Sequence, residues 1–108
     1  MSSRKSENQA QQVTVTTEAS VALKPLLESA VRTELRMLEI GLERTAQRLR
    51  DFEERFGLGS EEFERRFDSG QIDESLDFIE WAGEIKTYRL LQAQQQALQG
   101  VRLHFVAS

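Results

Sequence analysis

Residues 52–85 read FEERFGLGSEEFERRFDSGQIDESLDFIEWAGEI, and the breaks in this stretch decide the fold. Gly57 predicts a left-handed cap that ends one helix, because glycine adopts that backbone conformation without steric cost. Ser60 is then expected as the N-cap of a short helix at residues 61–67, which ends close to Gly70. The stretch therefore predicts a turn between two longer helices, with a short helix inside it.

A second long helix is expected after the turn. Asp73 predicts its N-cap, and the helical pattern runs over residues 74–98. Apolar side chains recur there at the spacing of one helix face. They are Phe78, Trp81, Ile85, Tyr88 and Leu91, widened by Ile79 and Ala82.

A first long helix is predicted before the turn, at residues 25–56. Pro25, the only proline, suits the first turn of a helix, where its missing N–H costs nothing. Its apolar stripe is Leu27, Val31, Leu35, Leu38, Leu42, Ala46, Leu49, Phe52 and Phe56. Met37 and Ile40 lie off this stripe and are either ordinary exposed apolar residues or part of a second contact. Two facing stripes predict a mainly α fold, a long antiparallel helical hairpin with a short helix at its tip.

The two ends of the chain carry different patterns. Residues 1–12 are polar with nothing to bury, which predicts a disordered lead-in, so residues 13–108 are expected to form a single domain. Residues 13–17 and 101–105 alternate apolar and polar side chains, which predicts a short β-strand near each terminus. These strands are expected to pair either with each other or with a partner.

The composition excludes several classes of protein. A chain of 108 residues forms at most one domain, and without cysteine it has no disulfide, thiol nucleophile or cysteine zinc site. No apolar run approaches the roughly 18 residues of a membrane helix, and residues 1–12 lack the apolar segment of a signal peptide. These features predict a cytoplasmic protein without membrane contact. The net charge of −4 argues against nucleic acid as the direct ligand.

Carboxylates are the only abundant reactive groups. The candidate metal ligands are Asp77, Glu80 and Glu84 on one helix face, with Glu61 or Glu62 from the short helix. This arrangement resembles the metal sites of all-α nucleotide pyrophosphatases, but Arg65 stands where that family's motif has a further ligand, and no phosphate-binding lysine cluster accompanies it. His104, the only histidine, has no acidic neighbour to make it a general base. The sequence therefore predicts no enzyme, no metal and no cofactor.

Most of the negative charge lies at the predicted tip. Between Asp51 and Glu84 there are twelve acidic residues and three arginines, a net charge of −9, whereas the rest of the chain is mildly basic. Such a surface predicts a basic protein partner, whose association is fast and sensitive to salt. The expected partner-binding residues are the steering carboxylates Glu61, Glu62, Glu64, Asp73, Asp77, Glu80 and Glu84 and the aromatic anchors Phe63, Phe67, Phe78 and Trp81.

Gly83 lies inside a helical pattern, where glycine costs about 1 kcal/mol relative to alanine, and this indicates a close approach. In one interpretation Trp81 lies in the core of the hairpin. Gly83 then makes room for Phe56 or Phe63. In the other interpretation Trp81 and Gly83 face a partner, since tryptophan is among the residues that dominate interface energies.

The order of residues over 49–90 resembles small prokaryotic helical proteins that are often encoded beside a toxin-like gene, the antitoxin type. The resemblance rests on Phe52-Glu53, Phe56-Gly57, Ser60-Glu61-Glu62-Phe63, Phe67, Gly70, Asp77-Phe78, Glu80-Trp81 and Gly83-Glu84. It implies a binder that neutralises a basic, nuclease-like toxin, with carboxylates in place of nucleic-acid phosphates. It also suggests an N-terminal ribbon-helix-helix, but after residues 13–17 the pattern is one uninterrupted long helix where that fold needs a turn.

A second class of function is compatible with the same stripes. They could be covered by further copies of the chain, as in a self-associating, coiled-coil-like scaffold or adaptor. The sequence leaves the choice between homodimer and heteromer open.

Overall fold

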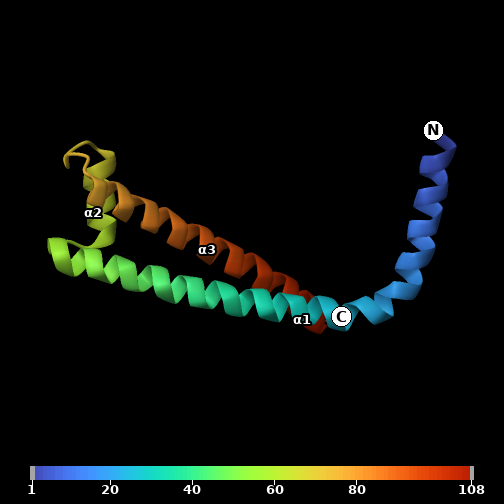
Figure 1. Cartoon of the computed structure of the whole chain (residues 1–108). Coiled ribbons are helices and arrows are strands. Elements are labelled where there is room, and N and C mark those ends of the chain that lie inside the picture. Colours follow the sequence, from blue (N-terminus) through green and yellow to red (C-terminus); the bar gives the residue numbers. More distant parts are fainter. Residues whose placement is uncertain (1, 108) are drawn as a thin grey trace.

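The computed structural model describes the backbone of residues 2–107 and the side chains of residues 23–104. This part of the chain forms three helices, α1 at Ser2–Phe56, α2 at Ser60–Asp68 and α3 at Leu76–Ala107. Figure 1 shows α1 and α3 running antiparallel, with α2 across the end where they are joined. We call this the closed end of the hairpin. The mainly helical fold and the long helix pair predicted from the sequence are confirmed.

The predicted terminal β-strands are wrong. Residues 13–17 lie in α1 and residues 101–105 in α3, and no strand occurs among the described residues. A run of five alternating residues is too short to outweigh its surroundings, because a strand needs a partner for its backbone groups whereas a helix satisfies them internally. Gly100 does not end α3, since one glycine inside a helix costs only about 1 kcal/mol.

The first helix begins well before Pro25. The proline lies inside α1, and the helical backbone extends to Ser2 through residues 2–12, the stretch predicted as a disordered lead-in. Proline inside a helix removes one backbone hydrogen bond and its ring crowds the carbonyl of residue 21, so a bend is expected there. Figure 1 shows α1 bending in its light-blue part, with the preceding segment directed away from α3.

Two glycines end helices at the closed end. Gly57 has φ +66° after α1, and the amide of Leu58 donates to the carbonyl of Glu53 at 3.3 Å. Gly70 has φ +78° after α2, and the amide of Gln71 donates to the carbonyl of Arg66 at 2.8 Å, with a second bond from Gly70 to Phe67. At both endings the residue after the glycine makes the 6→1 bond of the Schellman motif, and the glycine itself takes the left-handed conformation that this bond requires. The predicted glycine cap at Gly57 is confirmed.

Serine caps differ from those expected. Gly59 is the N-cap of α2, with no side-chain hydrogen bond, and Ser60 is already the first helical residue. Before α3 the cap is Ser75 and not Asp73, because the Ser75 hydroxyl accepts a hydrogen bond from the amide of Phe78 at 3.1 Å. The predicted caps at Ser60 and Asp73 are therefore wrong. Serine and aspartate are both preferred at N-caps, so Ser60 and Asp73 fit the sequence rule. The backbone conformation decides which of several neighbouring residues is the cap.

Three cross-helix contacts fix the register of α1 and α3. They are the approach of Leu91 to Gly41, the ion pair Arg48–Glu84 and the ion pair Arg55–Asp77. Successive contacts are seven residues apart on both helices, which is the repeat of a coiled coil. Gly41 explains one close point, since a Cβ there would lie 3.3 Å from Leu91 Cδ1.

The core lies at the closed end and draws on all three helices. Its buried members are Phe63, Trp81, Ala82 and Ile85, with Leu49, Phe52, Phe56, Leu58, Phe67, Ile72 and Phe78 partly buried around them. Farther along the pair, Leu38 and Thr45 are the buried residues among the described side chains of α1, residues 23–56. The closed end is therefore the best-packed part of the described chain, and it holds the surface side chains near it in fixed positions.

Candidate protein-binding groove

Two of the aromatic residues predicted to anchor a partner are fully buried. Phe63 and Trp81 are 0% exposed, and their rings stack with centroids 3.9 Å apart. Phe67 and Phe78 are half-buried against the same cluster. These four side chains therefore hold the closed end together and offer a partner little or no surface.

The exposed apolar residues of the closed end are different ones. Leu76 is 81% exposed and Ile79 is 50% exposed, and they stand one helical turn apart at the start of α3. The sequence pattern counted Ile79 as part of the core stripe and gave Leu76 no role. The signal that marks them is their offset from Phe78 and Trp81, which turns them to the opposite side of the helix.

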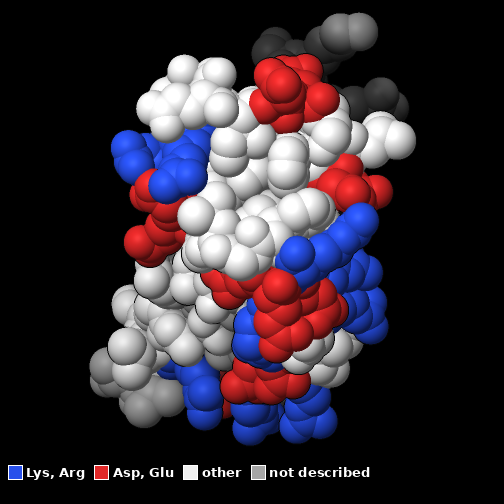
Figure 2. Space-filling view, turned by 90° about the vertical axis from the view of Figure 1, so that its left-hand side faces the viewer, with Lys and Arg blue, Asp and Glu red and all other residues white. Residues whose placement is uncertain are grey.

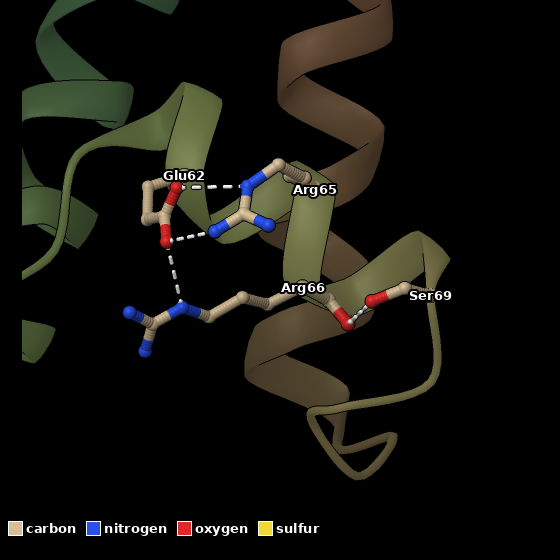
Figure 3. Close-up of polar contacts among 4 residues, drawn as sticks. All are labelled: Glu62, Arg65, Arg66 and Ser69. Carbon is tan, nitrogen blue, oxygen red and sulfur yellow. Dashed lines mark hydrogen bonds and ion pairs between the residues drawn. The ribbon is translucent and has the colours of Figure 1, made fainter.

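Four of the seven predicted steering carboxylates are held by arginines of the same chain. The pairs between helices are Glu84 with Arg48 at 2.9 Å, Asp77 with Arg55 at 3.0 Å and Glu64 with Arg89 through two bonds of 2.6 and 2.7 Å. Within α2, Glu62 accepts hydrogen bonds from Arg65 and Arg66 (Figure 3). The first three pairs connect the helices of the hairpin. In all four cases an arginine of the same chain offsets part of the negative charge that a partner would meet.

The arginine contacts shift the ionisation of Glu62. Hydrogen bonds from Arg65, and then from Arg66, lower the pKa of the Glu62 carboxyl from its ordinary value of 4.5. The same contact raises the pKa of Arg65. On the neighbouring turn the Ser69 hydroxyl donates to the carbonyl of Arg66 at 3.1 Å (Figure 3). This face of α2 is thus a closed network in which each charged group already has a partner.

Glu61, Asp73 and Glu80 differ from the other predicted residues. They are exposed, and they take part in none of the ion pairs found in the described part of the chain. Figure 2 looks onto the closed end, where uncharged surface crosses the middle and acidic and basic side chains alternate around it. The closed end is therefore a mixed surface with local acidic points, and not a uniformly acidic one.

A groove runs between α1 and α3 beside the closed end. Its volume is about 660 Å³, and it is lined by Arg48, Asp51, Phe52, Arg55, Asp77, Glu80, Gly83, Glu84 and Thr87. Four carboxylates and two arginines line it, so its formal charge is −2. Both arginines are engaged in the cross-helix ion pairs. The charge that remains belongs to Asp51, whose carboxylate accepts from Gln47 at 2.9 Å, and to Glu80.

Gly83 opens the middle of this groove. A Cβ built at Gly83 would meet no atom within 4 Å, so neither Phe56 nor Phe63 packs against it. The interpretation that Gly83 makes room for a phenylalanine of the core is therefore wrong. Below it the hydroxyl of Thr87 donates to the carbonyl of Gly83 at 3.0 Å, which turns this polar group back onto α3. At Gly83 the wall of the groove therefore has no side chain, and the Gly83 carbonyl already accepts a hydrogen bond from Thr87.

A second groove of about 580 Å³ lies among Ala46, Leu49, Glu53, Gly59, Ser60, Glu61, Ile85, Tyr88, Arg89 and Gln92. Three of its polar residues, Glu53, Ser60 and Arg89, are hydrogen-bonded within the chain. The Ser60 hydroxyl accepts from Trp81 Nε1 at 3.0 Å, and the Ser60 amide donates to Glu53 at 2.7 Å. Arg89 is held by Glu64. Because these contacts connect α2 to α1 and to α3, we assign this groove a structural role.

Candidate metal ligands do not converge. Among the described residues there is no group of three or more histidine or acidic side chains arranged to hold a metal ion. Asp77 and Glu84 face arginines instead. His104 lies in the last turn of α3, far along the sequence from the groove.

No helix in the described part of the chain combines the length and apolar character that crossing a membrane requires. Comparisons of the chain with protein-family models, curated proteins and solved structures found no match in any of the three.

Proposed function

We propose that this chain is a non-enzymatic protein-binding module that receives a basic segment of another protein in the groove between α1 and α3. One observation carries the proposal. The groove has two carboxylates without an ion pair, Asp51 and Glu80, and on α3 Glu80 follows the exposed Ile79 and lies one helical turn after the exposed Leu76. An apolar contact area with charges at its rim is typical of protein interfaces.

The resemblance of residues 49–90 to antitoxin-type proteins extends this proposal to the kind of partner. A toxin that acts on nucleic acid needs a basic surface for phosphates. A groove with a formal charge of −2 is complementary to such a surface. In this proposal the partner is a basic toxin, and binding covers its nucleic-acid surface.

Affinity purification from the native cells tests the proposal. The tagged chain is purified at low and at high salt, beside the variant Asp51→Lys/Glu80→Lys. We expect one basic protein to be retained at low salt, to elute as salt rises, and to be lost with the variant. The matched control is Glu39→Lys/Glu43→Lys, which reverses two charges of α1 outside the groove. If the groove variant retains the same protein as the wild type, the proposal fails.

Self-association is a second candidate, and a separate observation favours it. Exposed apolar side chains lie away from the closed end on both long helices, and they are Leu23, Leu26, Leu27, Met37 and Ile40 on α1 and Leu90, Val101 and Leu103 on α3. A second copy of the chain would cover them in a coiled-coil-like scaffold. Sedimentation at increasing dilution tests this, because Met37→Glu/Ile40→Glu would convert a dimer to a monomer if these residues form the contact.

A further inference from the structure

Gly83 has no explanation within the chain. Glycine inside a helix costs about 1 kcal/mol relative to alanine. Gly41 justifies this cost by its approach to Leu91, but at Gly83 an added Cβ would have open space around it, with no neighbouring atom within 4 Å. The residue is exposed and lines the groove. Gly83 therefore leaves space beside α3 where this helix lines the groove.

The neighbours of Gly83 on the same helix face define what fits there. Leu76 and Ile79 lie seven and four residues before it and are exposed, and Glu80 lies three residues before it. Residues at these spacings stand next to one another on a helix surface. The face thus combines two apolar side chains, one carboxylate and one position without a side chain.

The backbone of α3 limits how a partner can be recognised. The backbone amide and carbonyl of Gly83 make hydrogen bonds within α3 and are not free for a partner. The described part of the chain also has no strand edge to which an extended segment could add. A helix, by contrast, brings its own backbone bonds and packs through side chains. A position without a side chain lets two helix axes come closest.

We propose that the bound segment is a basic amphipathic helix that crosses α3 at Gly83. Its apolar side chains cover Leu76 and Ile79, and an arginine or lysine reaches Glu80 and Asp51. This inference rests on the proposed function and adds the form of the partner and the residue that selects it. Gly83 is the residue that determines specificity, because a larger side chain there separates the two helices.

A defined peptide tests the inference. The probe is an alanine-based helical peptide of about 20 residues that carries leucines and arginines on one face. We expect Gly83→Leu to weaken its binding by about tenfold or more, equivalent to about 1.4 kcal/mol. The matched control is Gly100→Leu, since Gly100 is also inside α3 with nothing within 4 Å and lies outside the groove. The Gly100→Leu variant is expected to bind the peptide with the affinity of the wild type.

Further outcomes separate this inference from the proposed function. If Asp51→Lys/Glu80→Lys leaves binding of the peptide unchanged, the groove proposal fails and the inference with it. If that variant abolishes binding but Gly83→Leu does not weaken it, only the helix crossing at Gly83 is overturned. A peptide of the same composition with two central prolines cannot form the helix. Equal affinity for that peptide would also overturn the inference, whereas its loss supports it. Circular dichroism verifies that each variant retains its helices.

Discussion

The indole of Trp81 lies flat on the ring of Phe63, with centroids 3.9 Å apart and planes within 3°. Trp81 also stacks against Phe52 and Phe56, with ring centroids 5.6 and 5.8 Å apart. Phe63 belongs to α2, Trp81 to α3 and the other two rings to α1. One side chain thus ties three helices together, and its Nε1 donates to Ser60 at 3.0 Å.

Removing this tie is expected to unfold the closed end. Trp81→Ala should cost about 3 to 5 kcal/mol, because a large side chain at 0% exposure leaves a cavity. Ser60→Ala should cost about 1 to 3 kcal/mol, because it leaves the buried indole N–H without an acceptor. Urea unfolding followed by circular dichroism measures both, with the exposed Ser29→Ala as a control expected to change little. A Ser60→Ala loss no larger than that of the control would refute the role of this hydrogen bond.

Ser75 is expected to determine where α3 begins. Its hydroxyl accepts the bond from the amide of Phe78, so Ser75→Ala should destabilise the protein by about 0.5 to 2 kcal/mol. Ser75→Asp keeps an acceptor at the cap and should retain nearly full stability. Thermal unfolding of the two variants makes the comparison. If Asp73→Ala destabilised the chain more than Ser75→Ala, the cap would lie at Asp73 after all.

Local sequence signals predict the helices, the turn glycine and the antiparallel packing. Such predictions are accurate where a backbone conformation strongly favours one residue type. At Gly57 the backbone is left-handed, a conformation that few residues other than glycine adopt. Steps of three and four predict the core stripe, which includes the buried Leu38 and Ile85. These features depend on neighbours in the chain, and a sequence displays them directly.

The sequence is less informative where distant residues meet. Its charge pattern predicts that Glu84 and Asp77 face a partner, but the hairpin brings Arg48 and Arg55 to them from another helix. The sequence pattern leaves Trp81 either in the hairpin core or facing a partner, and only the arrangement of three helices shows that it is buried. The same applies to Gly83, whose open surroundings follow from the groove and not from its neighbours in the sequence.

The ionisation of Glu62 offers a test of the network on α2. Its folded pKa lies below the unfolded value of 4.5, so its contribution to stability is present above pH 4.5 and is lost as pH falls through the lowered folded pKa. In Arg65→Gln/Arg66→Gln the hydrogen bonds are absent, and the pKa of Glu62 should rise toward 4.5. NMR titration of the side-chain carboxyl measures the shift. An unchanged titration midpoint in the double variant would contradict the arrangement in Figure 3.

The register of α1 against α3 can be tested by exchanging charges across it. Arg48 Nη1 lies 2.9 Å from Glu84 Oε1, and Glu84 is the less exposed partner. Because the arginine is largely in solvent, the pair should contribute only about 0.5 to 1 kcal/mol. Arg48→Glu and Glu84→Arg should each destabilise the hairpin through like charges, while the exchange Arg48→Glu/Glu84→Arg should recover most of the loss. Unfolding free energies of the four proteins form a double-mutant cycle. Simple additivity of the two losses would mean that residues 48 and 84 do not face each other, and the seven-residue register would have to be replaced by another.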